Sequence, residues 1–140
     1  MTLRLALFQL AGKAFALDLA LIEQVVSAPR RFSLPGLVPS MAGVFLQAGR
    51  IIPALTAAAL AGKTADRSEA WEGYYMICST EFGPLGLPAD RVLRVVQASA
   101  GALEPAPSGA ETDRIFHIEG ERYPLLRLET LPALRPCRQD

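Results

Sequence analysis

The apolar pattern of this chain occurs twice, half a chain apart, and this repeat is the strongest constraint on its fold. The segment Phe15–Val26 recurs as Leu85–Val96, at an offset of 70 residues. The segment Ile52–Leu55 likewise matches Tyr123–Leu126, at an offset of 71. Apolar positions match, whereas polar positions mostly differ. The pattern predicts two similar substructures, each too small to bury much alone, packed together. The alternative is a chance likeness between two strand–turn–strand patterns.

The composition is that of one domain with apolar surface to spare. The chain has 140 residues, of which 51% are hydrophobic and 20% charged, enough for a core and for a protein-binding surface. Its net charge of +0 gives no reason to expect nucleic acid. No apolar run is long enough to span a bilayer, and residues 1–8 lack the features of a signal peptide. We therefore expect a cytoplasmic protein with no direct membrane insertion.

Many short strands, with turns every ~8–12 residues, predict a sandwich or barrels. Asp18 is a plausible N-cap for a short helix over Leu19–Gln24. The polar stretch Ala61–Gly73 separates the two halves. The expected strands are Leu3–Leu10, Ala14–Leu17, Gly43–Leu46, Arg50–Leu55, Tyr74–Ser79, Leu85–Leu87, a strand within Asp90–Ala98, Arg114–Ile118 and Arg122–Leu128.

No arrangement of residues points to catalysis or to a metal. His117 is the only histidine, and no cysteine pair has the spacing of a zinc site. No G-x-S-x-G elbow is present, and Gly83–Gly86 lacks the lysine of a phosphate loop. Glu119 and Glu121 flank a turn glycine, where carboxylates are more often solvated than paired for acid–base work. We expect a protein that is not an enzyme and binds no cofactor.

Two stretches resemble the CheW family of chemotaxis adaptor proteins. The first runs from Phe8 to Val26 and resumes at Gly43–Leu55, which is similar to the family signature G-V-x-N-L-R-G-x-x-x-P-v-x-D-L. The second comprises Tyr74–Ser79 and Gly86–Val92, the latter similar to the run G-l-v-v-D-x-V, followed by a closing strand near Leu125–Glu129. The resemblance covers nearly the whole chain in the family's order.

The resemblance implies one CheW-like domain over residues 1–140, built from two pseudo-symmetric SH3-like five-stranded β-barrels whose halves meet near 61–73. It implies a non-catalytic adaptor that links the cytoplasmic tip of a chemoreceptor to the regulatory domain of a CheA-type histidine kinase. A groove between the barrels would receive the receptor helices. The resemblance places these residues in or near that groove: Ile22, Val25, Phe45, Leu46, Ala48, Leu87 and Val92.

The chain departs from the family pattern at polar positions. The signature's Asn-Leu-Arg falls on Leu46, Gln47 and Ala48, so its arginine is missing unless Arg50 substitutes for it. Its Asp falls on Thr56. A divergent adaptor could keep both partners, or bind receptors without coupling the kinase. A small-ligand-binding double barrel is the alternative from another class, and it would need a polar, convergent pocket.

The missing arginine is testable with Ala48→Arg. If the chain keeps the family's receptor contacts, the new side chain should tighten binding to a receptor tip, by roughly tenfold for each 1.4 kcal/mol gained. If the partners have changed together with the chain, the substitution should be neutral or harmful. Titration of both variants with a receptor-tip fragment distinguishes the two outcomes.

Overall fold

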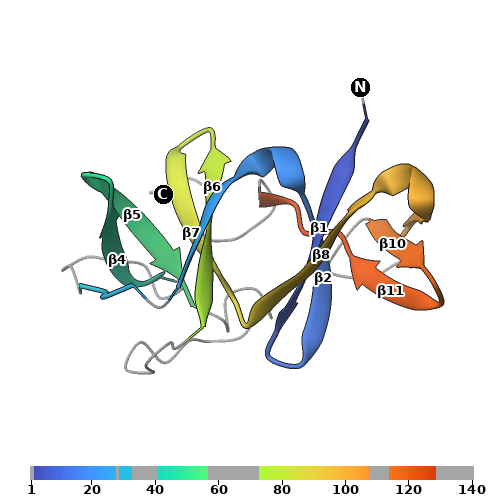
Figure 1. The fold of residues 1–140 in the computed structure, drawn as a ribbon, viewed down its shortest axis with the longest axis horizontal. Helices are drawn as coiled ribbons and strands as arrows, with labels where there is room; N and C mark the ends of the chain where they lie inside the picture. Colours follow the sequence, from blue (N-terminus) through green and yellow to red (C-terminus); the bar gives the residue numbers. More distant parts are fainter. Residues whose placement is uncertain (1, 28, 33–40, 57–72, 108–113, 129–140) are drawn as a thin grey trace, which may run out of the picture.

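The computed structural model describes residues 2–27, 29–32, 41–56, 73–107 and 114–128, and these are almost entirely β-structure. The all-β class predicted from the sequence is confirmed. The elements are β1 (Arg4–Leu10), β2 (Lys13–Asp18), the 3-10 turn η1 (Leu19–Leu21), β3 (Ile22–Ser27), β4 (Met41–Gln47), β5 (Arg50–Leu55), β6 (Tyr74–Thr80), β7 (Gly83–Ala89), β8 (Arg91–Gln97), the 3-10 turn η2 (Ala98–Ala100), β9 (Ala102–Pro105), β10 (Arg114–Ile118) and β11 (Glu121–Pro124) (Figure 1).

The sequence repeat is also a structural repeat. An offset of 70 residues carries the bounds of β1 onto those of β6, and it aligns β2 with β7 and β3 with β8. The two later hairpins, β4–β5 and β10–β11, correspond at an offset of 71. Their turns agree in detail, because Ala48-Gly49 and Glu119-Gly120 both have φ values of 51° and 78°. Two positive φ values in a two-residue turn match the twist of the flanking strands.

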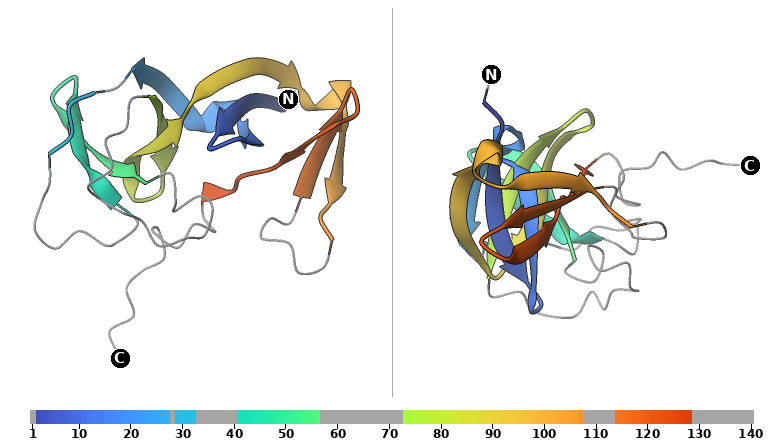
Figure 2. Two further views of the ribbon diagram at one scale, coloured as in Figure 1. Left: turned by 90° about the horizontal axis from the view of Figure 1, so that it is seen from below. Right: turned by 90° about the vertical axis from the view of Figure 1, so that its right-hand side faces the viewer.

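The two halves exchange strands. β8 of the second half pairs with β1, and β3 of the first half pairs with β6. The sheet orders are β2-β1-β8, β11-β10-β9 and β3-β6-β7-β5-β4. Two lobes result, each containing strands from both halves: the β4–β5 lobe (β3 to β7) and the β10–β11 lobe (the other strands) (Figure 2).

The described strands form three sheets, not the closed barrels that were expected. In the β4–β5 lobe, the chain after β3 meets β4 through one bridge, Phe32 to Val44, with N···O distances of 2.7 and 2.8 Å. A Cβ on Gly43, whose φ is 147°, would lie 2.7 Å from the Phe32 carbonyl oxygen. Only glycine allows this approach without a shift. A two-bond bridge brings the edges together but is not a continuous ladder.

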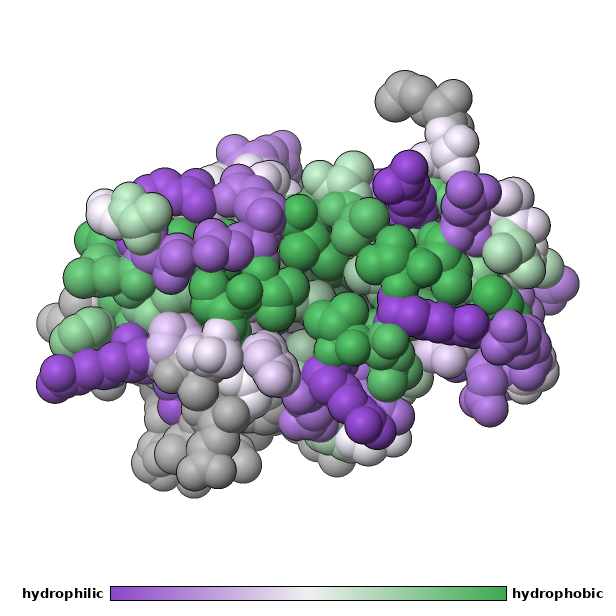
Figure 3. Space-filling model, viewed as in Figure 1, coloured by the Kyte–Doolittle hydropathy of each residue, from purple (hydrophilic) through white to green (hydrophobic). Residues whose placement is uncertain are grey.

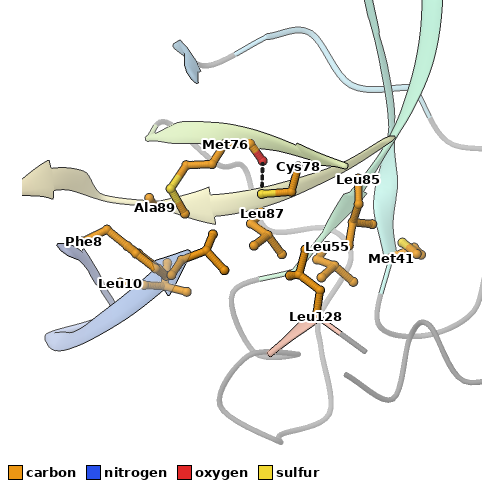
Figure 4. Packing of buried hydrophobic residues seen from close by; sticks show 11 residues of the cluster. Phe8, Leu10, Met41, Leu55, Met76, Cys78, Leu85, Leu87, Ala89 and Leu128 are labelled. Carbon is orange, nitrogen blue, oxygen red and sulfur yellow. Dashed lines mark hydrogen bonds between the residues drawn. The ribbon is translucent and has the colours of Figure 1, made fainter. Parts of the chain in front are cut away.

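The buried apolar residues of the described segments form three clusters, and the central one joins the lobes. The central cluster comprises Phe8, Leu10, Leu17, Met41, Leu55, Met76, Cys78, Leu85, Leu87, Ala89 and Leu128 (Figure 4). Successive residues of β1 face opposite sides, so Phe8 enters the central cluster while Leu7 enters the core of the β10–β11 lobe. Tyr75 and Ile77 of β6 pack in the β4–β5 lobe, whereas Met76 enters the central cluster. The first strand of each half is therefore buried on both faces.

Several local predictions can be compared with the structure. The helix expected over Leu19–Gln24 is shorter, because β3 starts at Ile22. Asp18 does cap it, and its carboxylate accepts the Ala20 N–H at 3.0 Å. The boundary expected near 61–73 lies almost wholly outside the described residues.

The central cluster predicts a large cost for Leu87→Ala. Leu87 is fully buried there, and removing a buried leucine side chain costs about 2–5 kcal/mol. Chemical denaturation should show this loss in one transition, because both lobes share the cluster. Leu93→Ala, at an exposed position of β8, is the matched control and should change stability by less than about 0.5 kcal/mol. Two separate transitions would contradict this account.

Candidate protein-binding face

β3 and β8 are edge strands of two different sheets, and they flank the middle of the molecule (Figure 1). Their pairing registers decide which side chains face the central cluster. Ile22 and Val25 of β3 lie opposite Cys78 and Met76 of that cluster. Residues directly opposite each other in antiparallel strands project to the same side, so both β3 side chains point toward the central cluster.

The β8 strand repeats this arrangement. Val92 lies opposite Phe8 of the central cluster, and Val95 lies opposite Ala6. These two residues correspond to Ile22 and Val25 at the offset of 70. Val25, Val92 and Val95 retain exposed fractions of 43%, 37% and 49%. Two equivalent strands therefore present apolar side chains at the open margin of the central cluster.

We name the residues Ile22, Val25, Val92, Leu93 and Val95 the β3–β8 face. Figure 3 shows hydrophobic residues gathered in a band across the middle of the molecule, where these two strands lie. Leu93 has an exposed fraction of 37%. Exposed apolar residues that gather in this way mark a site of protein contact more often than scattered ones do.

Both strands of the face carry a β-bulge, at equivalent positions. The register shifts between Ile22 and Gln24 on β3, which makes Glu23 the extra residue. It also shifts opposite Leu7 and Phe8 of β1, which makes Leu93 the extra residue on β8. A bulge leaves one residue out of the ladder, increases the twist and discourages the addition of another strand at that edge. Recognition at this face therefore depends on side chains.

Glu23 ties β3 to two other strands of the β4–β5 lobe. Its carboxylate accepts a hydrogen bond from Arg50 Nη2 at 2.8 Å and another from the Ser79 hydroxyl at 2.7 Å. The pKa of the Glu23 carboxyl is lowered from its ordinary value of 4.5, first by the bond from Arg50 and then by the bond from Ser79. The ion pair orients Arg50 toward Glu23.

The β8 strand also forms an ion pair, at positions that do not correspond to Glu23 and Arg50 in the repeat, and here the strand supplies the arginine. Arg94 of β8 pairs with Glu119 in the β10–β11 turn, with Nη2 and Oε2 2.9 Å apart. Arg91, also on β8, donates from Nε to Gln9 Oε1 at 3.0 Å. Both arginines lie opposite residues of β1 that face away from the central cluster. The charged residues of β8 are therefore directed away from the apolar face.

The structure brings together three of the residues expected in the groove, namely Ile22, Val25 and Val92. Leu46 and Ala48 lie elsewhere, on the outward side and at the tip of the β4–β5 hairpin. Phe45 and Leu87 require correction, because both are fully buried. Phe45 packs on Tyr75 in the β4–β5 lobe, with ring centroids 5.2 Å apart, and Leu87 lies in the central cluster.

Sequence reasoning missed Val95 and Leu93. The repeat itself could have found Val95, because it is the counterpart of Val25 at the offset of 70. Leu93 had no such signal, since its counterpart is Glu23 and its exposure follows from the bulge.

The titratable side chains of the described residues give little indication of a catalytic or metal site. They contain no group of three or more His, Cys, Asp or Glu side chains that could hold a metal ion. Burial raises the pKa of the Cys78 thiol to about 12, so it is a poor nucleophile. His117 Nε2 lies 3.5 Å from Glu104 Oε2 on an adjacent strand. None of the helices in this part of the chain is long and apolar enough to cross a membrane.

The lowered pKa of Glu23 predicts a pH-dependent contribution to stability. A carboxyl with a lowered folded-state pKa adds stability that is complete above its unfolded pKa and is lost as the pH falls through the folded pKa. We expect Glu23→Gln to be less stable than wild type at pH 7, and the difference to shrink as the pH falls below 4.5 and to disappear once the pH is below the lowered folded-state pKa. Urea denaturation across this range measures it. Glu121→Gln, on the other hairpin, controls for the loss of one surface charge, and a difference that persists in acid would contradict the assignment.

The comparisons with known proteins agree with this architecture. The family model for the CheW-like domain matches residues 4–135. The fold is similar to the crystal structure of the scaffolding protein TtCheW from Thermoanaerobacter tengcongensis, with a TM-score of 0.75 and 20% sequence identity over 91% of this chain and 90% of that one. No curated protein matched the sequence. The match over nearly the whole length shows that this chain belongs to the CheW-like domain family.

Proposed function

We propose that this protein is a non-catalytic adaptor of a chemosensory system, whose β3–β8 face receives the cytoplasmic tip of a chemoreceptor. Membership of the CheW-like family supports this role. The observation that carries this proposal is the placement of apolar side chains on two equivalent edge strands. Each of these strands pairs with a strand, β1 or β6, that contributes side chains to the central cluster. This function would place the protein in the cytoplasm, beside the receptor tip.

An amphipathic helix suits this face better than an extended strand. The bulges at Glu23 and Leu93 interrupt the two edges along which a strand would pair. A helix needs no backbone partner, and it places apolar side chains at i, i+3, i+4 and i+7 on one side. The exposed valines of β3 and β8 offer two apolar walls to such a stripe.

Binding at this face should depend little on salt. Glu23 and Arg94, the charged residues at the middle of each strand, are already paired with Arg50 and Glu119. Interactions between exposed charges weaken as salt screens them, whereas burial of apolar surface does not. We expect the dissociation constant to change by no more than roughly twofold between low and high salt.

A second apolar surface supports a second partner. Leu46 and Ile51 lie opposite each other on the β4–β5 hairpin, with exposed fractions of 59% and 60%. Phe82, in the β6–β7 turn, is 63% exposed and lies at the same end of the lobe, because β5 and β7 are parallel. We assign this end to contact with the regulatory domain of a CheA-type histidine kinase.

The two surfaces are separable by mutation. Val25→Asp should weaken binding of a receptor-tip fragment by roughly a hundredfold or more, because it places an unpaired charge in an apolar contact. Leu46→Asp should leave receptor binding intact and weaken binding of the kinase regulatory domain. Calorimetric titration of both ligands against both variants, with circular dichroism as the check on folding, measures this.

Each result has a defined meaning. Unchanged receptor binding by a folded Val25→Asp variant would reject the β3–β8 face. Receptor binding by the wild type without any kinase-domain binding would favour the accessory adaptor that does not couple the kinase. Absence of receptor binding by the wild type would reject the proposed function.

A further inference from the structure

The chain passes from one lobe to the other through a single residue. β7 ends at Ala89 in the β4–β5 lobe, and β8 begins at Arg91 in the β10–β11 lobe. Asp90 is the only residue between them. The corresponding passage in the first half, from β2 to β3, uses the three residues of η1. The direction of β8 therefore depends on the conformation and contacts of Asp90.

Asp90 is held by the end of β1 and by the β1–β2 turn. Its backbone N–H donates to the Gln9 carbonyl at 2.7 Å. Its carboxylate Oδ2 accepts the Ala11 N–H at 2.9 Å, a contact between residues 79 positions apart. The adjacent Arg91 donates from Nε to the Gln9 side chain at 3.0 Å. Three hydrogen bonds thus fix the start of β8 on β1, two residues before Val92.

The Asp90 carboxylate also provides a hydrogen-bond acceptor for a turn residue with an uncommon backbone conformation. Ala11 has a φ of 52°, which is uncommon for a residue with a side chain. An acceptor on its N–H stabilises that turn in place. The position equivalent to Asp90 in the first half is Ala20, which carries no side-chain acceptor. The first half of the repeat therefore lacks an equivalent of this contact, and only the passage into β8 has it.

We propose that Asp90 is a positioning residue for the β3–β8 face, whose carboxylate fixes the angle at which β8 presents Val92 and Val95. The inference rests on the proposed function of that face. Asp90 itself does not contact the partner. Its effect is carried by the direction of β8, and it depends on an acceptor atom and not on a negative charge.

The test compares Asp90→Ala with Asp90→Asn. Asparagine keeps an oxygen that can accept the Ala11 N–H, whereas alanine removes it. We expect Asp90→Ala to bind a receptor-tip fragment roughly three- to tenfold more weakly, and Asp90→Asn to restore most of the affinity. Amide exchange should be faster at Ala11 in the alanine variant only. Methyl NMR of Val92 and Val95 should shift in the same variant, without any ligand. Glu104→Ala, far from this corner, is the control for a lost surface carboxylate.

Three results would overturn the proposal. They are wild-type affinity in a folded Asp90→Ala variant, equal losses in both variants, and unchanged exchange at Ala11. If Asp90→Ala does not fold, Asp90→Asn still decides: affinity and Ala11 protection near wild type support the acceptor role, and their loss rejects it. If the wild type does not bind the fragment, the proposed function fails. In that case the positioning role toward a partner fails with it, while the exchange and NMR measurements still report whether Asp90 holds β8.

Discussion

Burial of β1 and β6 on both faces is the constraint on which the rest of the structure depends. Each of these strands has one side in a lobe core and the other in the central cluster. Each also pairs with a strand from the other half of the chain. The pairings bring β3 and β8 to the open margin of the central cluster, and the apolar face follows from that placement. The site is thus a continuation of the core and not an addition to it.

The composition of the β3–β8 face fits the proposed adaptor role. Its side chains are aliphatic, and the charged residues beside it form ion pairs within the chain. The hydrogen bonds made by Glu23 and by Asp90 act on the two strands separately, one within the β4–β5 lobe and one at the start of β8. An adaptor needs binding strands with fixed orientations more than it needs reactive groups, and these hydrogen bonds fix the orientations of β3 and β8.

The sequence repeat and the alternation of apolar residues predicted most strands and the all-β class. Strand exchange was beyond such reasoning, because an apolar pattern shows that one side of a strand is buried but not which strand lies beside it. The same ambiguity explains Phe45 and Leu87, which alternation alone could not assign to core or surface. Ile22, Val25 and Val92, which the family resemblance placed in a receptor groove, lie on strands β3 and β8, and their role in binding stays a prediction. The bulge at Leu93 depends on pairing with β1, so no local signal could have indicated it.

Strand exchange also bears on how the molecule responds to a broken backbone. Cutting the chain between Thr56 and Gly73 would separate the two halves covalently, yet β3 would still pair with β6 and β8 with β1. The fragments would share three sheet contacts and the central cluster, so neither has a complete core without the other. Such a molecule is suited to fragment complementation, with the two pieces expressed separately and assembling into one fold. The peptide link keeps the two halves close together, while the side chains and backbones of the strands determine which strands pair.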